Sequence, residues 1–508
     1  MTPFEEFRRW LRQGRTSEKA VSAVAAVVAF ALVMWTLIPT GDGTEAEQEV
    51  VAGASVQPGA QAASGTTGTA VDPITGAPIS SVAGSSGALG GSAVGAASGG
   101  AATTGSTPAQ SAASACPASG PRGITSKTIL LAITNPDLGP LNELINIPSP
   151  EQQIAMNKAM VDWANKNGGV ACRQIAIKQY ADNPIDANAE RALCLQIVQD
   201  KPFVNLGGLY TPENADCLPQ NKIPQYELTG ISSERLVKYR QYLFSYYNST
   251  DRSFRDYVYG ARAVGWFQGL KRIGVFHGNC NPNLAPQLFA VLAEAGYPKG
   301  SYSTYDIGCP ASIEAARGPT LQAVLKFKGD GVTHVMSGGT PLHQFATTAD
   351  QQDYHPKYAV SDADETIFIS DGSAAPDAVF DGALAITGSK YGGYNSGIDP
   401  GPLTAVCDGI MKAAGLPTTR EKNAYAGGVC NTWFLFLESA KRVTGTLVPE
   451  ALAGALDTLG VIDLSYPGGK ANFTKPGTNY ATGYWREARY NGACKCWKIP
   501  NAAWQNGF

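Results

Sequence analysis

Short apolar segments of strand length alternate with helical segments from about residue 122 onward, and this alternation constrains the fold more than any other feature. Ile129–Ile133 is a continuous apolar run, and Ser149–Gln152 has the order of a helix capping box with proline at the first helical position. The helix that follows should place Met156 and Met160 on one buried face. The pattern therefore begins as a strand followed by a helix.

The same pattern repeats along the chain. A second strand is expected at Gln174–Tyr180, and the next helix should begin near Asp186. Its inward face should carry Ala189, Leu193 and Ile197. Five more strands are expected at Phe203–Leu206, Gln225–Leu228, Arg272–Phe276, His334–Met336 and Tyr358–Val360. Short buried strands joined by helices are typical of parallel sheets, so the sequence predicts an α/β, doubly wound fold.

The loops after these strands are where a ligand is expected, because open α/β sheets bind ligands beyond the carboxyl ends of their strands. They are rich in Gly, hydroxyl and amide groups, as in Gly207–Thr211, Thr229–Ser233, His277–Asn279, Ser337–Thr340 and Ser361–Glu365. This composition suits hydrogen bonds to a small polar solute, with Tyr210 as a flat apolar wall. The alternative for any one loop is that Gly and Ser only turn the chain.

Several local motifs, taken in order, resemble the type I periplasmic binding proteins of the Leu/Ile/Val class that serve ABC importers. The motifs are Asn167-Gly168-Gly169-Val170, Ala181-Asp182-Asn183-Pro184, Asn205-Leu206-Gly207-Gly208, Tyr242-Leu243-Phe244-Ser245 and Lys271-Arg272-Ile273-Gly274-Val275-Phe276. The resemblance covers roughly residues 122–500. Each motif alone is weak, whereas their collinear order is more specific.

The resemblance implies two doubly wound lobes of the Venus-flytrap type, joined by three crossings and closing by hinge motion around a solute. Lobe one would comprise about 122–247 and 390–465, and lobe two about 248–389 and the C-terminal segment. The family's ligand-binding positions map here to Tyr210, Thr211, Thr229, Ile231, Ser232, Asn281, Asn283, Gly339 and Asp362.

One of these segments departs from the family sequence, and one residue has an alternative structural role. Leu209-Tyr210-Thr211 replaces a Ser-rich run that holds the ligand carboxylate in the family, which argues against an α-amino acid as the solute. Asp362 could pair with a cationic nitrogen of a ligand, but an Asp at a strand end also caps the next turn.

The ten cysteines all lie in residues 116–508 and are even in number, which favours disulfides in an oxidising compartment. The resemblance implies the pair Cys194–Cys217. Proximity in sequence suggests two further pairs, Cys280–Cys309 and Cys407–Cys430, and leaves Cys116, Cys172, Cys494 and Cys496 unassigned. No metal site is expected, because Cys494-Lys495-Cys496 is tighter than C-x-x-C and no His follows it.

The N-terminal region predicts a membrane anchor. Residues 20–41 are uncharged and long enough to cross a bilayer as a helix. Four arginines precede the segment and acidic residues follow it, so residues 1–19 should be cytoplasmic and the rest extracytoplasmic. A cleaved signal peptide is the alternative, but no small-x-small site ends the apolar stretch. Residues 42–121 are rich in Gly, Ala, Ser and Thr and are expected to form a disordered linker.

Charge and motif content narrow the function classes. Once the five basic and eight acidic residues of 1–121 are removed from the totals of 39 and 42, 34 of each sign remain, and this neutrality argues against nucleic-acid binding. The globular part has no H-E-x-x-H, Walker or G-x-S-x-G motif, so neither an enzyme nor a cofactor is predicted.

The sequence therefore predicts a membrane-tethered, extracytoplasmic protein that captures a small solute, such as an amino acid, amide or aromatic compound, for an ABC permease. A ligand-sensing ectodomain that signals through a partner protein is the alternative. About 19 cytoplasmic residues are too few to carry a signalling domain of their own. The sequence does not identify the solute.

Overall fold

The computed structural model describes residues 120–139, 142, 147–310, 312–362, 378–419, 424–474, 477, 480, 481 and 483–508. The chain divides into two units, Met1–Thr67 and Gly68–Phe508, and every described residue belongs to the second. The predicted anchor, residues 20–41, and nearly all of the predicted linker lie outside the described residues. Among the helices of the described ranges, none combines the length and apolar character that a membrane span requires.

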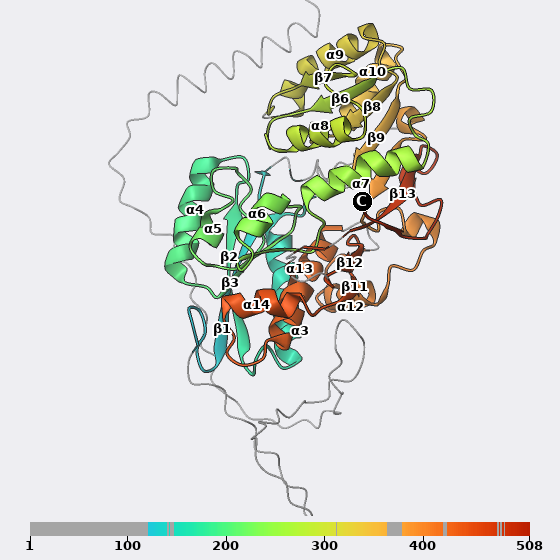
Figure 1. The fold of residues 1–508 in the computed structure, drawn as a ribbon. Coiled ribbons are helices and arrows are strands. Elements are labelled where there is room, and N and C mark those ends of the chain that lie inside the picture. The colour runs from blue at the N-terminus through green and yellow to red at the C-terminus, as the bar shows by residue number, and fades with distance from the viewer. Residues whose placement is uncertain are drawn as a thin grey trace, which may run out of the picture. The chain divides into compact units, whose positions relative to one another are not determined.

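Five parallel strands form the first sheet, in the order β2-β1-β3-β4-β5 (Figure 1). The strands are β1 (Thr128–Pro136), β2 (Gln174–Asp182), β3 (Val204–Leu206), β4 (Gln225–Glu227) and β5 (Leu243–Ser245). The helices between them are α3 (Pro150–Lys166), α4 (Ala187–Asp200), α5 (Cys217–Gln220) and α6 (Ser233–Lys238). The predicted capping box opens α3, since the Ser149 side chain accepts from the Gln152 N–H and the Gln152 side chain accepts from the Ser149 N–H.

The second sheet repeats this order. Its parallel strands run β7-β6-β8-β9-β10, and β13 and β14 extend the sheet in antiparallel pairing beyond β10. The strands are β6 (Ile273–His277), β7 (Tyr302–Asp306), β8 (His334–Ser337), β9 (Lys357–Ser361), β10 (Leu384–Thr387), β13 (Tyr484–Asn491), β14 (Cys496–Lys498) and β15 (Gln505–Asn506), which pairs with β13. The helices are α7 (Thr250–Ala263), α8 (Leu284–Glu294), α9 (Ile313–Gly329), α10 (His343–Gln351) and the short η3 (Ala378–Phe380).

The chain returns to the first sheet after β10. The returning elements are η4 (Tyr394–Ser396), α12 (Pro402–Ala413), α13 (Ala424–Arg442), α14 (Pro449–Leu456), β11 (Val461–Asp463) and β12 (Lys470–Asn472). Trp433 and Phe434 of α13 share one hydrophobic core with Leu131 of β1 and Met160 of α3. Residues distant in sequence thus build lobe one, defined here as the first sheet with its helices, and lobe two is the second sheet with its own.

Both faces of each sheet are covered by helices, which is what the predicted doubly wound fold requires. In lobe one, α3, α12 and α13 contribute to the core on one face, while α4 and α5 contribute to a separate core on the other. In lobe two, α9 and α10 share a core that is separate from the core of α7 and α8. The α/β prediction is confirmed for these two sheets.

One detail of the predicted pattern is wrong. Leu193 and Ile197 of α4 are buried as expected, but Ala189 is exposed and its neighbour Glu190 is buried instead. Glu190 is buried because its carboxylate accepts hydrogen bonds from the loop after β3, and not because of apolar packing.

The disulfides agree with the proposed pairs. Cys194–Cys217, Cys280–Cys309 and Cys407–Cys430 are all bridged. A fourth bridge joins Cys494 to Cys496. Cys172 is also disulfide-bonded, and Cys116 lies outside the described residues.

Removing the buried Cys407–Cys430 bridge is expected to lower the free energy of unfolding by about 3 kcal/mol, because a bridge of this span restricts the unfolded chain. The double variant Cys407→Ala/Cys430→Ala, compared with wild type in urea unfolding, measures this effect. The matched control is Cys494→Ala/Cys496→Ala, whose bridge spans a sequence separation of only 2 and should matter much less. Equal losses in the two variants would contradict the loop-closure argument.

Candidate ligand-binding site

Three segments connect the two lobes. The first crossing, residues 246–249, joins β5 to α7; the second, 388–401, joins β10 to α12; and the third, 473–483, joins β12 to β13. All three border one cavity, together with the start of α7, the end of β9 and the turn between β11 and β12. A change in the angle between the lobes would therefore change the shape of this cavity.

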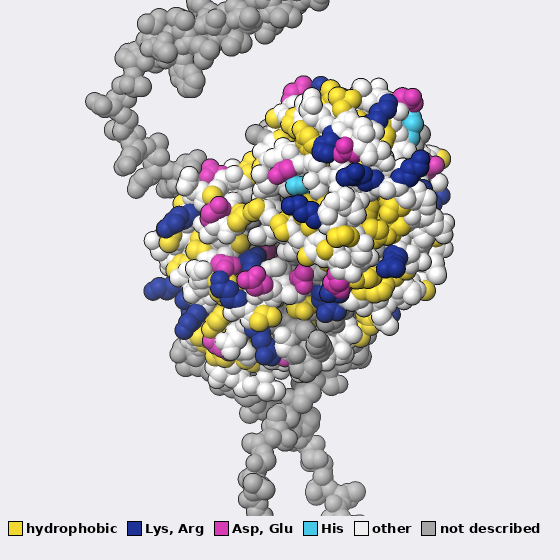
Figure 2. Space-filling view, turned by 45° about the horizontal axis from the view of Figure 1, so that its top comes forward, with side chains coloured by type: hydrophobic (Ala, Val, Ile, Leu, Met, Phe, Trp, Pro, Cys, Tyr) yellow, Lys and Arg dark blue, Asp and Glu magenta, His cyan; other side chains and the backbone are white. Residues whose placement is uncertain are grey.

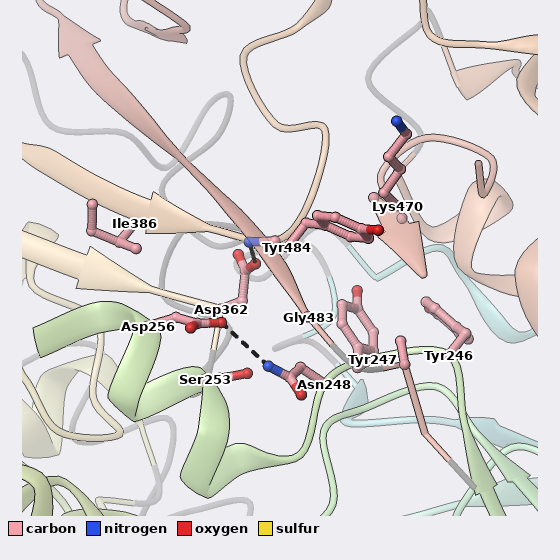
Figure 3. A pocket seen from close by; sticks show the side chains of 14 residues that line it. Tyr246, Tyr247, Asn248, Ser253, Asp256, Asp362, Ile386, Lys470, Gly483 and Tyr484 are labelled. Atoms are coloured by element: carbon pink, nitrogen blue, oxygen red, sulfur yellow. Dashed lines mark hydrogen bonds between the residues drawn. The ribbon is translucent and has the colours of Figure 1, made fainter. Parts of the chain in front are cut away.

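The cavity combines carboxylates with tyrosine rings. Asp256 and Asp362 contribute the carboxylates, and Tyr246, Tyr247 and Tyr484 contribute the rings. In Figure 3 the two carboxylates lie near one another, and the amino group of Lys470 points away from them. Such a lining offers flat apolar walls with a few fixed polar groups, which is the chemistry of small-molecule sites, although the enclosed volume is only about 30 Å³ and a solute would need the lobes to separate to enter.

Asp362, which the sequence predicts as a ligand contact, organises the second crossing. Its carboxylate accepts hydrogen bonds from the Thr387 hydroxyl at 2.8 Å, the Gly388 N–H at 2.6 Å and the Ser389 N–H at 3.1 Å. Burial raises the pKa of Asp362 to about 6, and these hydrogen bonds oppose that rise. The carboxylate is thus engaged by the end of β10 and the start of the second crossing, and the same residue also lines the cavity; the turn that directly follows Asp362 lies outside the described residues.

Asp256 ties the first crossing to the C-terminus. Its carboxylate accepts from the Phe508 N–H at 2.7 Å and from the Asn248 amide at 3.3 Å (Figure 3). Burial raises its pKa to about 6, and Asp362 adds to this rise. The two carboxylates are therefore electrostatically coupled.

The second crossing is fastened to the turn between β11 and β12. The buried Lys390 ammonium donates to the carbonyl oxygens of Pro400 and Leu464 and lies 2.9 Å from the Asp463 carboxylate. The Lys390 N–H also donates to the Pro467 carbonyl at 2.7 Å. Burial lowers the pKa of Lys390, and the Asp463 carboxylate opposes this.

The predicted residues of lobe one lie at the carboxyl ends of adjacent parallel strands. Tyr210 and Thr211 follow β3, and Thr229, Ile231 and Ser232 follow β4. The structure thus brings the two loops to the same edge of the sheet, as the parallel pairing requires.

Several of these groups are already engaged within the protein. The Thr211 N–H donates to Glu190, Ser232 caps α6 by accepting from the Arg235 N–H, and Ile231 is 2% exposed in a small core with Leu236. Tyr210 and Thr229 are partly exposed.

In lobe two the predicted residues are more scattered. Asn281 and Asn283 are exposed, and the Asn281 side chain accepts from the Asn283 N–H at 3.2 Å within the turn before α8. Gly339 follows β8 with φ +105°, and a Cβ there would lie 3.1 Å from the Leu284 side chain. None of these three lines the cavity at the crossings, whereas Asp362 does.

The sequence reasoning missed most of the cavity lining. The Tyr242–Ser245 motif of the resemblance is directly followed by Tyr246, Tyr247 and Asn248. The motif could therefore have been used to predict these residues at the first crossing. Gly469 and Tyr484 come from the C-terminal part, where no motif marks a crossing.

No family model and no curated protein matches the chain. Solved structures do. A fatty acid ABC transporter substrate-binding protein from Thermomonospora curvata has a TM-score of 0.55 at 14% identity, covering 77% of this chain and 94% of its own.

Two further structures are similar. A solute-binding protein of an R. palustris ABC transporter, in complex with 4-hydroxybenzoate, has a TM-score of 0.56 at 13% identity and covers 75% of this chain and 98% of its own. A branched-chain amino acid transporter substrate-binding protein from Streptococcus pneumoniae, in complex with isoleucine, has a TM-score of 0.52 at 14% identity and covers 75% and 100%. The resemblance inferred from the sequence is thereby confirmed as a likeness of fold.

Proposed function

We propose that this chain is a solute-binding protein that captures a small polar or aromatic solute between its lobes and delivers it to an ABC importer. The observation that carries the proposal is that three separate crossings between the two lobes border one cavity. In such an arrangement a ligand that contacts both lobes stabilises one angle between them, which is hinge-type capture. The similar structures named above are transport-related binding proteins, which supports this function without identifying the solute.

The lining of the cavity supports binding and does not call for catalysis. Tyr247 and Tyr484 present aromatic rings to the cavity. The carboxylates of Asp256 and Asp362 are held in place by hydrogen bonds from backbone N–H groups of the protein. Transfer of an unchanged solute requires only this kind of surface.

Tethering is the second part of the proposal. Residues 20–41 would anchor the protein, with residues 42–121 as the spacer and the globular part outside the cytoplasm. Four disulfides among the described residues are consistent with an oxidising compartment. N-terminal sequencing of the mature protein tests this part, and a start anywhere after Ala20 would show that the segment is a signal peptide and refute the anchor.

A thermal-shift screen of small acids, amides, amines and aromatic compounds is expected to find at least one stabilising solute. A ligand at 100 times its dissociation constant stabilises the native state by about 2.7 kcal/mol, which is a clear shift in melting temperature. Calorimetry then gives the affinity. For any hit, Thr229→Ala at the sheet edge should weaken binding roughly tenfold, as expected for a lost hydrogen bond.

The matched control is Thr347→Ala on α10, whose hydroxyl is exposed and donates to the His343 carbonyl. It should leave the affinity unchanged. A screen in which no compound of any class shifts the melting temperature would count against solute capture.

A further inference from the structure

A buried carboxylate of the protein itself occupies a set of hydrogen-bond donors at the ligand edge of lobe one. Glu190, in the first turns of α4, is 0% exposed. Its Oε1 accepts from the Tyr210 N–H at 2.5 Å, and its Oε2 accepts from the Thr211 N–H at 2.9 Å and from the Thr211 hydroxyl. Two successive backbone N–H groups and a hydroxyl therefore converge on one carboxylate, which is the geometry of an anion-binding nest.

This nest lies at the part of the first sheet where a ligand is expected to bind. Tyr210 and Thr211 follow β3, which lies beside β1 at the point where the strand order of the first sheet reverses. Open α/β sheets bind their ligands at this switch point, beyond the carboxyl ends of the strands. Donors placed there would suit the anionic group of a ligand, but in this chain their hydrogen bonds go to Glu190.

Other acidic groups face the same region. Glu227, at the end of β4, packs against the loop that carries the nest, since a Cβ on Gly208 would lie 2.3 Å from the Glu227 Oε2. Asp182, at the end of β2, is fully buried, and neither of its carboxylate oxygens has a hydrogen-bond partner. Arg235 favours the charged form of Glu227.

Glu190, Glu227 and Asp182 bring carboxyl oxygens to this edge, and the donors bound by Glu190 are not available to an anionic ligand. Glu190 uses three donors, and Glu227 accepts from the Gln225 amide at 2.5 Å. Asp182 also lines a second pocket of about 410 Å³ with Asp137 and Asn183. A carboxylate brought to the loop after β3 would meet the charge of Glu190 and find the Tyr210 and Thr211 N–H groups already engaged. An N–H or O–H group would instead meet carboxyl oxygens that can accept.

We propose that Glu190 is a specificity-determining residue, which closes the anion site of lobe one so that the solute presents an uncharged or cationic hydrogen-bond donor to this edge and not a carboxylate. The inference rests on the proposed function and names its ligand class: amides, alcohols or amines in preference to carboxylic acids. The ligands named for the similar structures, a fatty acid, 4-hydroxybenzoate and isoleucine, all carry carboxylates. The inference therefore sets this chain apart from them.

The first test compares solutes that differ only in the acid group. Calorimetry on the whole protein would use isoleucine against isoleucinamide, and 4-hydroxybenzoate against 4-hydroxybenzamide. We expect the amide of a binding pair to bind at least tenfold more tightly than its acid. An acid that binds more tightly than its amide would overturn the inference while leaving the proposed function in place.

The second test opens the nest and does not depend on knowing the solute. In Glu190→Ala the donors of Tyr210 and Thr211 lose their partner, so formate should raise the melting temperature of this variant and not that of wild type. The acid-to-amide affinity ratio of any binding pair should also rise at least tenfold in the variant, which a purely structural role of Glu190 would not produce. Glu190→Gln, which keeps the shape of the side chain, serves for the ratio if Glu190→Ala fails to fold.

The control is Glu213→Ala, which removes an exposed carboxylate near the same loop and should show no response to formate. A Glu190 variant that is insensitive to formate, or whose acid-to-amide ratio equals that of wild type, would overturn the inference. If neither member of either pair binds, the formate measurement still decides whether the nest is an anion site.

Discussion

Replacing Gly469 with alanine is expected to lower the free energy of unfolding by roughly 3 kcal/mol, at the upper end of overpacking substitutions. Gly469 lies in the turn between β11 and β12, where a Cβ would stand 1.6 Å from the Gly388 carbonyl oxygen of the second crossing. The position of a Cβ is fixed by its own backbone and its partner is a backbone carbonyl, so no rotamer change can relieve the contact. The turn and the crossing would have to separate, and the hydrogen bond from Lys390 to Pro467 would be strained with them.

Urea unfolding of Gly469→Ala measures the loss, and calorimetry with a confirmed solute measures whether the cavity at the crossings is altered. The matched control is Gly409→Ala inside α12, where a Cβ would meet no atom within 4 Å. That variant should gain stability, by up to about 1 kcal/mol, because alanine favours the helix. If Gly469→Ala unfolds like wild type, the second crossing does not pack on the turn as described.

The order of strands was predictable because buried parallel strands are short apolar runs bounded by polar loops. Ile129–Ile133 and Tyr358–Val360 needed no knowledge of their partners to be recognised. The pairing of β13 with β10 is different, since an alternating strand such as Tyr484–Asn491 shows its buried face only when its neighbour is known. The Cys494–Cys496 bridge was likewise left open, because sequence alone does not set disulfide connectivity.

The candidate site was harder to predict, because hydrogen-bond partners are set by tertiary contacts. The sequence suggests that the Thr211 hydroxyl is available to a ligand. In the structure both its hydroxyl and its N–H donate to Glu190, twenty-one residues earlier. The helical pattern assigned the buried position to Ala189, since periodicity counts apolar residues and gives no weight to a carboxylate that finds donors. Gly388 and Gly469 approach each other across more than eighty residues, and no local pattern records that contact.

Asp182→Asn is expected to make the protein more stable at alkaline pH and to flatten the fall of stability with pH. Burial raises the pKa of Asp182 from its ordinary value of 3.8 to about 8, and the charges of Glu190 and Glu227 add to this rise. The folded protein therefore keeps a proton that the unfolded chain releases near pH 4. Stability from this group is fully present below the unfolded pKa and is lost as pH rises toward 8, by roughly 1.4 kcal/mol per pH unit within that window.

Urea unfolding of wild type and Asp182→Asn at several pH values between 5 and 9 measures the two slopes. Glu227, whose pKa burial raises to about 7, should keep part of the pH dependence in the variant. The matched control is Asp162→Asn on α3, which removes an exposed carboxylate paired with Lys158 and should leave the slope unchanged. Parallel curves for wild type and Asp182→Asn would mean that Asp182 is already ionised in the folded state. A cation or donor would then have to satisfy its two unpartnered oxygens, because an unpaired buried carboxylate is too costly to persist alone.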